Sequence, residues 1–173
     1  GIPFHPYYTV KDIMGVVVFL AVFSMIVFFV PEMGGYFLEA NNFIPADPLK
    51  TPAHIAPVWY FTPFYAMLRA VPDQRMGALL MVLAILAFFF LPWLDRSPVK
   101  SVRYRGWIFK TFLAIFTVSF LALMYLGLKP ASTAYVYAAR VFTAGYFAFF
   151  VLMYWFSKWD RTKPVPTRVT FHA

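Results

Sequence analysis

The run IMGVVVFLAVFSMIVFFV, residues 13–30, decides what kind of fold this chain adopts. Ser24 is the one polar side chain among its eighteen residues. An α-helix rises about 1.5 Å per residue, so about 20 apolar residues are needed to cross the ~30 Å hydrocarbon layer of a bilayer. The run falls within the usual range for a membrane span, and we interpret it as a transmembrane helix.

Three further apolar runs of similar length follow. Pro92 interrupts the first of them near its end, Lys110 lies about one turn inside the second, and Arg140 lies near one end of the third. We therefore predict an all-α membrane protein that forms a single domain over residues 1–173. Its four transmembrane helices are expected at about residues 13–30, 76–94, 107–128 and 134–159.

The composition also indicates a bilayer as the solvent of this chain. Of the 173 residues, 62% are hydrophobic and 13% are charged, whereas soluble domains have about 45–50% and roughly 25%. The net charge of +8 comes from short basic clusters between apolar runs, so nucleic acid is not an expected partner. The absence of cysteine excludes disulfides, thiolate metal sites and cysteine nucleophiles.

The lysine and arginine residues predict the orientation, because cytoplasmic loops carry more of them. Nine basic residues fall on the side of the two chain ends and the 95–106 loop, and four fall on the side of the 31–75 loop. Both termini are therefore expected in the cytoplasm, with the 31–75 loop outside. The nine are Lys11, Arg96, Lys100, Arg103, Arg105, Lys158, Arg161, Lys163 and Arg168. The four are Lys50, Arg69, Arg75 and Lys129.

The 31–75 loop is unusually long for a connection between two spans. Within it, the stretch KTPAHIAPVWYF at residues 50–61 changes abruptly from polar and proline-rich to aromatic. Loops that carry such residues on a rigid scaffold are frequent sites of binding and chemistry. The segment Trp59–Leu68 has no glycine and only Pro63 as a breaker. We predict a short amphipathic helix there, lying along the outer surface.

Three motifs occur in order along the chain: FHPYYTVKD at residues 4–12, DPLKTP at 47–52 and PVWYF at 57–61. With four helices in this arrangement, the chain closely resembles the C-terminal half of cytochrome b, the membrane core of the quinol:cytochrome c oxidoreductase (bc1) complex. The resemblance covers nearly the whole chain, and the four runs correspond to helices E to H of that family. The related b6f subunit has three helices, so the fourth run favours the bc1 type.

The resemblance implies two quinone-binding patches on opposite faces of the membrane. One matches the quinol-oxidation pocket on the positive, outer side, and comprises Pro57, Val58, Trp59, Tyr60, Phe61 and Tyr65. The other matches the quinone-reduction pocket on the negative side, and comprises Phe4, His5, Tyr8, Lys11 and Asp12. The orientation predicted from the charges used no motif, and it also places these two segments on opposite faces.

The residue types suit a quinone. Its ring is flat and apolar with two carbonyls, so aromatic walls and a few proton carriers fit it. Asp12 can deliver or accept a proton, Lys11 can neutralise or relay charge, and His5 titrates near neutral pH. Without the resemblance, Lys11 and Asp12 would be an ordinary pair beside a membrane span, and Trp59 and Tyr60 would be surface anchors.

Val58 departs from the family pattern, in which this motif is often Pro-Glu-Trp-Tyr with a carboxylate that binds or deprotonates quinol. Some bacterial members resemble this chain in that respect, so quinol oxidation is still expected. The same likeness favours a bacterial inner membrane over a mitochondrial one as the location. Valine cannot carry the protons that the reaction releases outward. We hypothesise that His54, Glu39 or Asp47 takes them instead. The predicted catalytic residues are Asp12, Lys11 and His54.

The family implies cofactors and partners outside this chain. Cytochrome b holds two b haems through histidine pairs on helices of its N-terminal half. The three histidines here, His5, His54 and His172, lie outside the apolar runs, so no haem ligation, no metal site and no catalysis by the chain alone are expected. The expected partners are that N-terminal half, a Rieske iron–sulfur protein and cytochrome c1, in a dimeric complex in a lipid membrane. The start at Gly1 suggests a split cytochrome b or a part of a longer chain.

Two alternatives come from other functional classes. A four-helix structural or assembly subunit could pack against a redox core without binding quinone. Binding of a quinone-site inhibitor would distinguish this role from the quinone-site role that the resemblance implies. A transporter fragment would need broken helices or ionisable residues at mid-membrane. The apolar runs contain no acidic residue, which disfavours a transporter.

Overall fold

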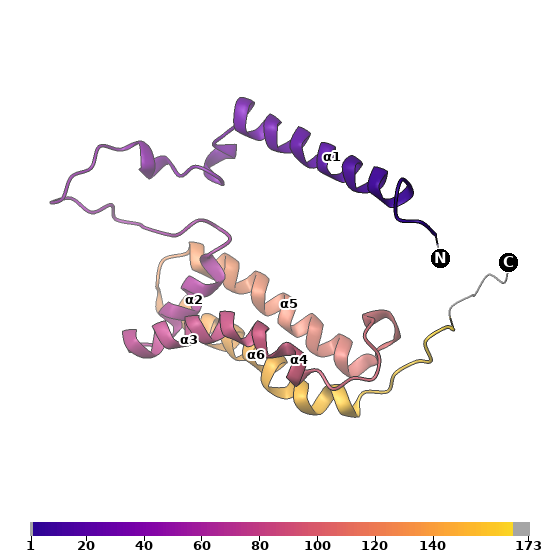
Figure 1. The fold of residues 1–173 in the computed structure, drawn as a ribbon. Coiled ribbons are helices and arrows are strands. Elements are labelled where there is room, and N and C mark those ends of the chain that lie inside the picture. The colour runs from indigo at the N-terminus through magenta and orange to yellow at the C-terminus, as the bar shows by residue number, and fades with distance from the viewer. Residues whose placement is uncertain (1, 168–173) are drawn as a thin grey trace. The chain divides into compact units, whose positions relative to one another are not determined.

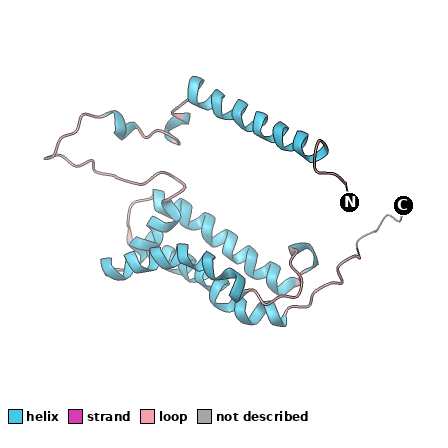
Figure 2. Ribbon diagram, in the orientation of Figure 1, coloured by secondary structure: helices cyan, strands magenta, loops and turns pink. Residues whose placement is uncertain are grey.

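The computed structural model describes residues 2–167, which form helices, turns and loops (Figure 2). Arg168 and His172, which entered the predictions above, lie outside the described residues. Four helices are long and apolar enough to span a membrane, which confirms the predicted all-α fold with four spans. They are Tyr7–Phe29, Gln74–Leu94, Trp107–Leu128 and Thr133–Trp159. The chain divides into two compact units, unit 1 (Gly1–Ala53) and unit 2 (His54–Ala173); the single domain stays a prediction.

Unit 1 is built on α1 (Tyr7–Phe29), followed by the short 3-10 helices η1 (Met33–Gly35) and η2 (Ala40–Phe43). α1 begins six residues before the predicted start, because the apolar run marks only the part that lipid can surround and the helix continues through polar residues at its N-terminal end. Proline is tolerated where a helix starts, and Pro6 occupies the N-cap. After Phe29 the chain turns at Pro31, which cannot supply a helical N–H.

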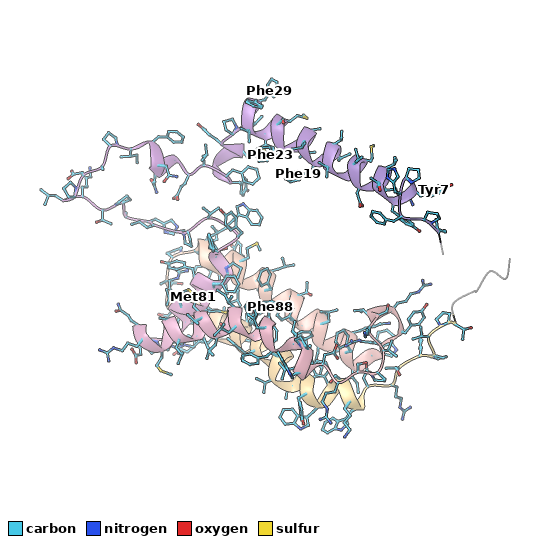
Figure 3. The ribbon with its side chains drawn as sticks, in the orientation of Figure 1. Tyr7, Phe19, Phe23, Phe29, Met81 and Phe88 are labelled. Carbon is cyan, nitrogen blue, oxygen red and sulfur yellow. The ribbon has the colours of Figure 1, made fainter. Side chains whose placement is uncertain are left out.

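No residue of α1 is buried. Figure 3 labels four of its aromatic side chains along the whole helix, and all of them are exposed. A helix that is apolar on every side and unburied needs lipid or other helices around it. The four labelled side chains are Tyr7, Phe19, Phe23 and Phe29.

Unit 2 contains the remaining three spans and the short helix of the outer loop. α5 (Trp107–Leu128) and α6 (Thr133–Trp159) pack against each other, and α2 (Thr62–Ala70) packs against both of them and against α3 (Gln74–Leu86) (Figure 1). α5 has the predicted bounds. α6 starts one residue early because the Ser132 hydroxyl accepts a hydrogen bond from the Tyr135 N–H and caps the helix.

Pro92 shapes the second span. Proline removes a backbone N–H, and its ring clashes with the carbonyl four residues earlier, here that of Phe88. The span therefore consists of α3, the 3-10 helix η3 (Ala87–Phe90) and the short α4 (Leu91–Leu94). Its start at Gln74 is two residues earlier than predicted, because the Asp73 carboxylate accepts a hydrogen bond from the Arg75 N–H.

Aromatic side chains fill the centre of unit 2. Tyr146 of α6 is fully buried, and its hydroxyl donates a 2.8 Å hydrogen bond to the Ala84 carbonyl of α3. The Phe116 ring of α5 lies 4.9 Å from the Tyr146 ring, centroid to centroid. Lipid tails are as apolar as side chains, so close packing and interhelical hydrogen bonds hold membrane helices together. The hydrogen bond of Tyr146 therefore joins two spans whose relative position apolar contact alone would determine only weakly.

The short helix predicted in the outer loop is present as α2, shifted by three residues at its start. One face of it is buried against the neighbouring spans, and its remaining residues are half-buried. The predicted position along the outer surface of the membrane stays a prediction. Gly127 of α5 makes this packing possible, because a Cβ there would collide with the backbone and side chain of Thr62. The buried residues of α2 are Thr62, Pro63, Ala66, Met67 and Ala70.

Candidate functional site

The predicted quinol-oxidation residues form one continuous aromatic ledge, which we define as residues 57–61. The Phe61 N–H donates to the Val58 carbonyl at 2.8 Å, and the Thr62 hydroxyl donates to the Trp59 carbonyl, so the ledge turns directly into α2. Pro57, Val58 and Trp59 are half-buried. Backbone hydrogen bonds at both ends of the turn thus hold the ledge against the start of the helix.

The outer rings of the ledge are arranged in sequence. Trp59 meets Tyr60 edge to face with ring centroids 5.5 Å apart, and the Tyr60 and Phe61 rings lie 4.8 Å apart. Tyr60 and Phe61 are about half exposed, at 49% and 56%. Two aromatic rings therefore remain available to a flat ligand. Val58 offers no titratable group at this place.

Tyr65, the sixth predicted residue, lies on the first turn of α2, where its N–H donates to the Phe61 carbonyl at 3.1 Å. The guanidinium carbon of Arg69 lies 4.5 Å from the centre of the Tyr65 ring. A guanidinium over an aromatic face is attractive. In the sequence, Arg69 is one of the four basic residues assigned to the outer side. The spacing of four residues on a helix, which makes side chains neighbours, could have indicated the pair.

Arg69 also joins α2 to α5. Its Nη2 atom donates to the carbonyls of Leu126 and Lys129, both at 2.9 Å. These are carbonyls at the C-terminal end of α5, which a cation stabilises. Its Nε atom is buried and has no hydrogen-bond partner among residues 2–167.

Arg140 of α6 binds the C-terminal end of α2, beside Arg69. Its Nε donates to the Ala70 carbonyl at 2.8 Å, and its guanidinium carbon lies 5.2 Å from the centre of the Tyr137 ring. The sequence placed this arginine near one end of the fourth apolar run. Two arginines from different positions in the chain thus bind backbone carbonyls at helix ends and fix α2, which carries Tyr65, to α5 and α6.

The predicted quinone-reduction residues lie together at the start of α1. The Phe4 and Tyr8 rings are stacked 6.0 Å apart, the His5 Nδ1 lies 3.3 Å from the Thr9 hydroxyl, and the Lys11 ammonium lies 5.5 Å from the centre of the Tyr8 ring. All the predicted side chains of this patch are exposed. Asp12 is one helical turn from Tyr8 and has no hydrogen-bond partner among the described residues.

The three candidate proton acceptors of the outer loop differ in surroundings. Glu39 accepts a hydrogen bond from the Asn41 amide at 3.0 Å, and Asp47 accepts one from the Leu49 N–H at 2.9 Å. His54 is exposed and lies three residues before the ledge. Glu39 and Asp47 belong to unit 1 and His54 to unit 2, so His54 is the candidate that the chain itself keeps near Val58.

The described residues do not fit haem ligation. His5 precedes α1 and His54 lies in a loop, so neither occupies a membrane span from which a histidine could reach an iron inside the bilayer. Within residues 2–167, no group of three or more histidine, aspartate or glutamate side chains could hold a metal ion.

The sequence profile that matches residues 45–147 describes the family cytochrome b (C-terminal)/b6/petD. A cytochrome b from Allochromatium vinosum is 65% identical over 98% of this chain and 42% of its own length. A cytochrome b from Rhodospirillum rubrum is 49% identical over 98% of this chain and 41% of its own length.

A chain in a solved structure described as a hyperthermophilic respiratory Complex III is also similar, with a TM-score of 0.80 and 41% sequence identity. The match covers 90% of this chain and 38% of that chain. The present chain thus spans about two fifths of the length of these relatives.

Proposed function

This chain belongs to the cytochrome b (C-terminal)/b6/petD family, and from that premise we propose that it is the quinone-site half of a cytochrome b in a bc1-type respiratory complex. It takes part in quinol oxidation at the positive side of the membrane and in quinone reduction at the negative side. The observation that carries the proposal is the aromatic ledge, residues 57–61, held against α2 with Tyr65 one turn beyond it.

At the ledge, the rings of Tyr60, Phe61 and Tyr65 stack on the substrate ring and exclude water from one side of it. Oxidation of one quinol to quinone releases two protons and two electrons. The electrons leave to redox centres held by other parts of the complex. The protons need a nearby acceptor, and His54 supplies an imidazole three residues from the ledge. Glu39 and Asp47 are the other two candidates for this role.

At the start of α1, the opposite chemistry takes place. Quinone that accepts two electrons must also take up two protons from the cytoplasmic side. Asp12 delivers a proton, Lys11 neutralises the developing charge on the substrate oxygen, and His5 relays protons from water. Phe4 and Tyr8, already stacked on each other, form the aromatic wall.

The same proposal sets the surroundings of the chain. It lies in a bacterial inner membrane with both termini in the cytoplasm. Its partners are the N-terminal half of cytochrome b with its two b haems, a Rieske iron–sulfur protein and cytochrome c1, in a dimer. The excess of basic residues on the 95–106 side and the length of the relatives support this arrangement.

Binding of a short-tailed benzoquinone analogue to the purified complex tests the quinone-site role. Tyr65→Ala removes one aromatic wall, and we expect about tenfold weaker binding at the outer site. Tyr154→Ala is the matched control. Tyr154 is an exposed aromatic residue near the C-terminal end of α6, whereas α2 with Tyr65 is bound near the N-terminal part of α6. Asp12→Asn is expected to weaken the second site, with Glu32→Gln, beyond the far end of α1, as its control. Unchanged binding in both site variants would favour the structural-subunit role instead.

The outer proton acceptor has a separate test. His54→Gln, Glu39→Gln and Asp47→Asn are made one at a time, and the rate of quinol oxidation is followed against pH. We expect His54→Gln to slow quinol oxidation. If all three variants kept the normal rate and pH profile, none of these groups would be the acceptor.

A further inference from the structure

A groove lies at the end of unit 2 opposite α2, where the 95–106 loop meets the spans. Its volume is about 530 Å³. Its lining has two chemically different parts. The floor comes from the spans and is apolar, formed by Leu91, Pro92, Phe109, Phe149 and Met153. The rim comes from the loop and is largely polar, formed by Asp95, Ser97, Lys100, Val102 and Arg105.

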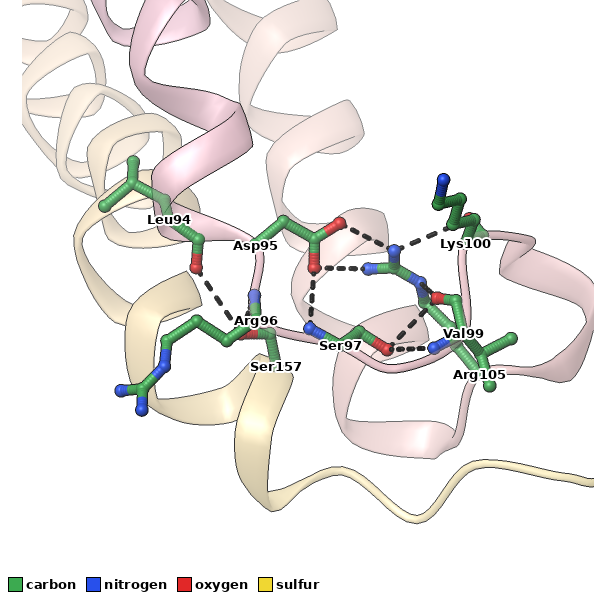
Figure 4. A network of polar contacts seen from close by, with 8 residues as sticks. All are labelled: Leu94, Asp95, Arg96, Ser97, Val99, Lys100, Arg105 and Ser157. Carbon is green, nitrogen blue, oxygen red and sulfur yellow. Dashed lines mark hydrogen bonds and ion pairs between the residues drawn. The ribbon is translucent and has the colours of Figure 1, made fainter.

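The polar rim is held in place by Arg105 (Figure 4). Its guanidinium forms a two-pronged pair with the Asp95 carboxylate, at 3.0 and 2.6 Å, and its Nε donates to the Val99 carbonyl at 2.9 Å. The Arg105 side chain is 5% exposed, and its guanidinium carbon lies 4.3 Å from the centre of the Phe109 ring. Paired arginine–carboxylate hydrogen bonds fix geometry as well as charge. These hydrogen bonds therefore hold the 95–106 loop in a defined conformation at the rim of the groove.

Two further contacts join this loop to the end of α6. The Arg96 N–H donates to the Ser157 hydroxyl at 3.1 Å, and the Gly106 N–H donates to the Asp160 carboxylate at 2.8 Å. Both ends of the loop are thus bonded to residues at the end of α6. The rim and the floor belong to one packed unit.

The rim carries uncompensated positive charge. Asp95 is the only acidic residue in the 95–106 loop, and it pairs with Arg105, which is the one ion pair within residues 2–167. Lys100 is exposed, and in Figure 4 its ammonium end points away from the Asp95 carboxylate. Arg96 and Arg103 belong to the same loop but lie outside the groove lining.

The groove lies at the level of a membrane surface. Trp93 and Trp107, on the two spans that the loop connects, are 72% and 84% exposed. Exposed tryptophans at the ends of spans sit at the boundary between headgroups and hydrocarbon. The floor of the groove therefore faces the hydrocarbon layer, and the rim faces the headgroups.

We propose that this groove binds one phospholipid with an anionic headgroup. The headgroup phosphate pairs with the Lys100 ammonium, while an acyl chain lies along Phe109, Phe149 and Met153. Basic pockets between membrane helices have the chemistry that selects anionic lipids. The proposal depends on the membrane spans and is independent of the quinone chemistry.

The division between rim and floor distinguishes this ligand from others. Free phosphate would use the rim and leave the apolar floor without a partner. A quinone would use the floor, but it carries no charge for Lys100 to neutralise. A phospholipid with an anionic headgroup matches both parts. A zwitterionic phospholipid also matches the floor, but its headgroup has no net charge and is attracted less strongly to Lys100.

The test uses the purified complex after delipidation, with dioleoyl-phosphatidylglycerol added back and bound lipid counted by native mass spectrometry. Lys100→Ser is expected to weaken binding roughly fivefold, since one basic residue near the membrane surface contributes a factor of about that size. Arg103→Ser, an exposed change in the same loop outside the groove lining, is the matched control and is expected to keep most of the binding.

A second pair of variants tests the groove without altering charge. Val102→Trp fills the mouth and is expected to abolish the bound lipid, whereas Val102→Ala keeps it. The proposal is overturned if Lys100→Ser and Arg103→Ser lose binding equally, or if Val102→Trp binds like the unaltered complex. It is also overturned if inorganic phosphate or phosphatidylethanolamine at the same concentration displaces phosphatidylglycerol completely.

Discussion

α1 in unit 1 and α6 in unit 2 are both long and apolar enough to cross a membrane, yet their surroundings within the chain are opposite. α1 buries no residue. α6 lies against α2, α4 and α5 and buries Ala139, Thr143, Tyr146, Phe149, Phe150, Met153, Phe156 and Ser157. Apolar content therefore does not distinguish α6, which is packed within its own unit, from α1, which has no buried residue within unit 1.

The distribution of small and polar residues accounts for the difference. In α6, Thr143 and Ser157 are buried, and Gly145 lets the Ser119 hydroxyl of α5 approach closely. Small residues of this kind allow membrane helices to come together. In α1, Gly15 has no side chain or backbone nearby. Within unit 1, α1 therefore makes no such close helix contact at Gly15.

Removing Arg105 is expected to have the largest effect, confined to unit 2. Arg105→Ala leaves the Asp95 carboxylate partly buried without its cation, which costs about 3 kcal/mol. The measurement is the thermal-unfolding midpoint of the purified complex. Arg103→Ala is the control, because Arg103 is exposed on the same loop. Equal midpoints for the two variants would show that the pair does not hold the loop.

Arg69→Ala is expected to destabilise unit 2 by about 2 kcal/mol, because the hydrogen bonds to the Leu126 and Lys129 carbonyls are charge-assisted. Under the proposed function, Tyr65 also loses its cation, and the KM for quinol rises more than kcat falls. Arg69→Lys keeps the positive charge but lacks the planar guanidinium group, so it should restore part of the stability and part of the affinity for quinol. Arg75→Ala changes an exposed arginine in the first turn of α3 and should affect neither stability nor KM. An equal loss in that variant would contradict the role given to Arg69.

A pair of glycine substitutions compares the two units directly. Gly127→Ala pushes a methyl group into Thr62 and should cost about 1 kcal/mol through overpacking. Gly15→Ala meets nothing within the chain and should be neutral or slightly stabilising, because alanine favours a helix. Both are measured as shifts in the unfolding midpoint of the complex. A clear loss with Gly15→Ala would mean that another helix, not lipid, covers that face of α1.

The smallest expected effect is that of Tyr146→Phe, which removes the hydrogen bond to Ala84. Hydrogen bonds between membrane helices contribute about 0.6 kcal/mol on average. Tyr137→Phe serves as the control, because Tyr137 is 60% exposed on the same helix. If the two variants had the same unfolding midpoint, packing alone would hold α3 to α6.

The spans could be predicted because lipid imposes a length and an apolar composition on any helix that crosses it. α5 has the predicted bounds, and the other spans differ at their ends, where capping by Ser132 or Asp73 decides. The change to a 3-10 helix before Pro92 follows from proline chemistry, although the run predicted one continuous helix. Local rules thus explain most of the boundary differences.

The sequence predicted which residues belong to the candidate site, but not the contacts that hold them in place. The ledge at residues 57–61 and Tyr65 are close in sequence, so their proximity follows from a turn and one helical step. The two arginine bonds that hold α2 could not be predicted in this way. The Arg69 partners and the Arg140 partner lie about 60 or more residues away along the chain, and single-sequence patterns carry no such pairing.

The sequence by itself determined the membrane class, the four spans, the family resemblance and the residues to test, because each depends on local composition or on short motifs. Only the tertiary structure decided which helix packs and which does not, where Gly127 admits α2, and which carbonyls Arg69 and Arg140 bind. It also brought the 95–106 loop over Phe149 and Met153 to form a groove. These features depend on shape complementarity between distant segments, which composition does not encode.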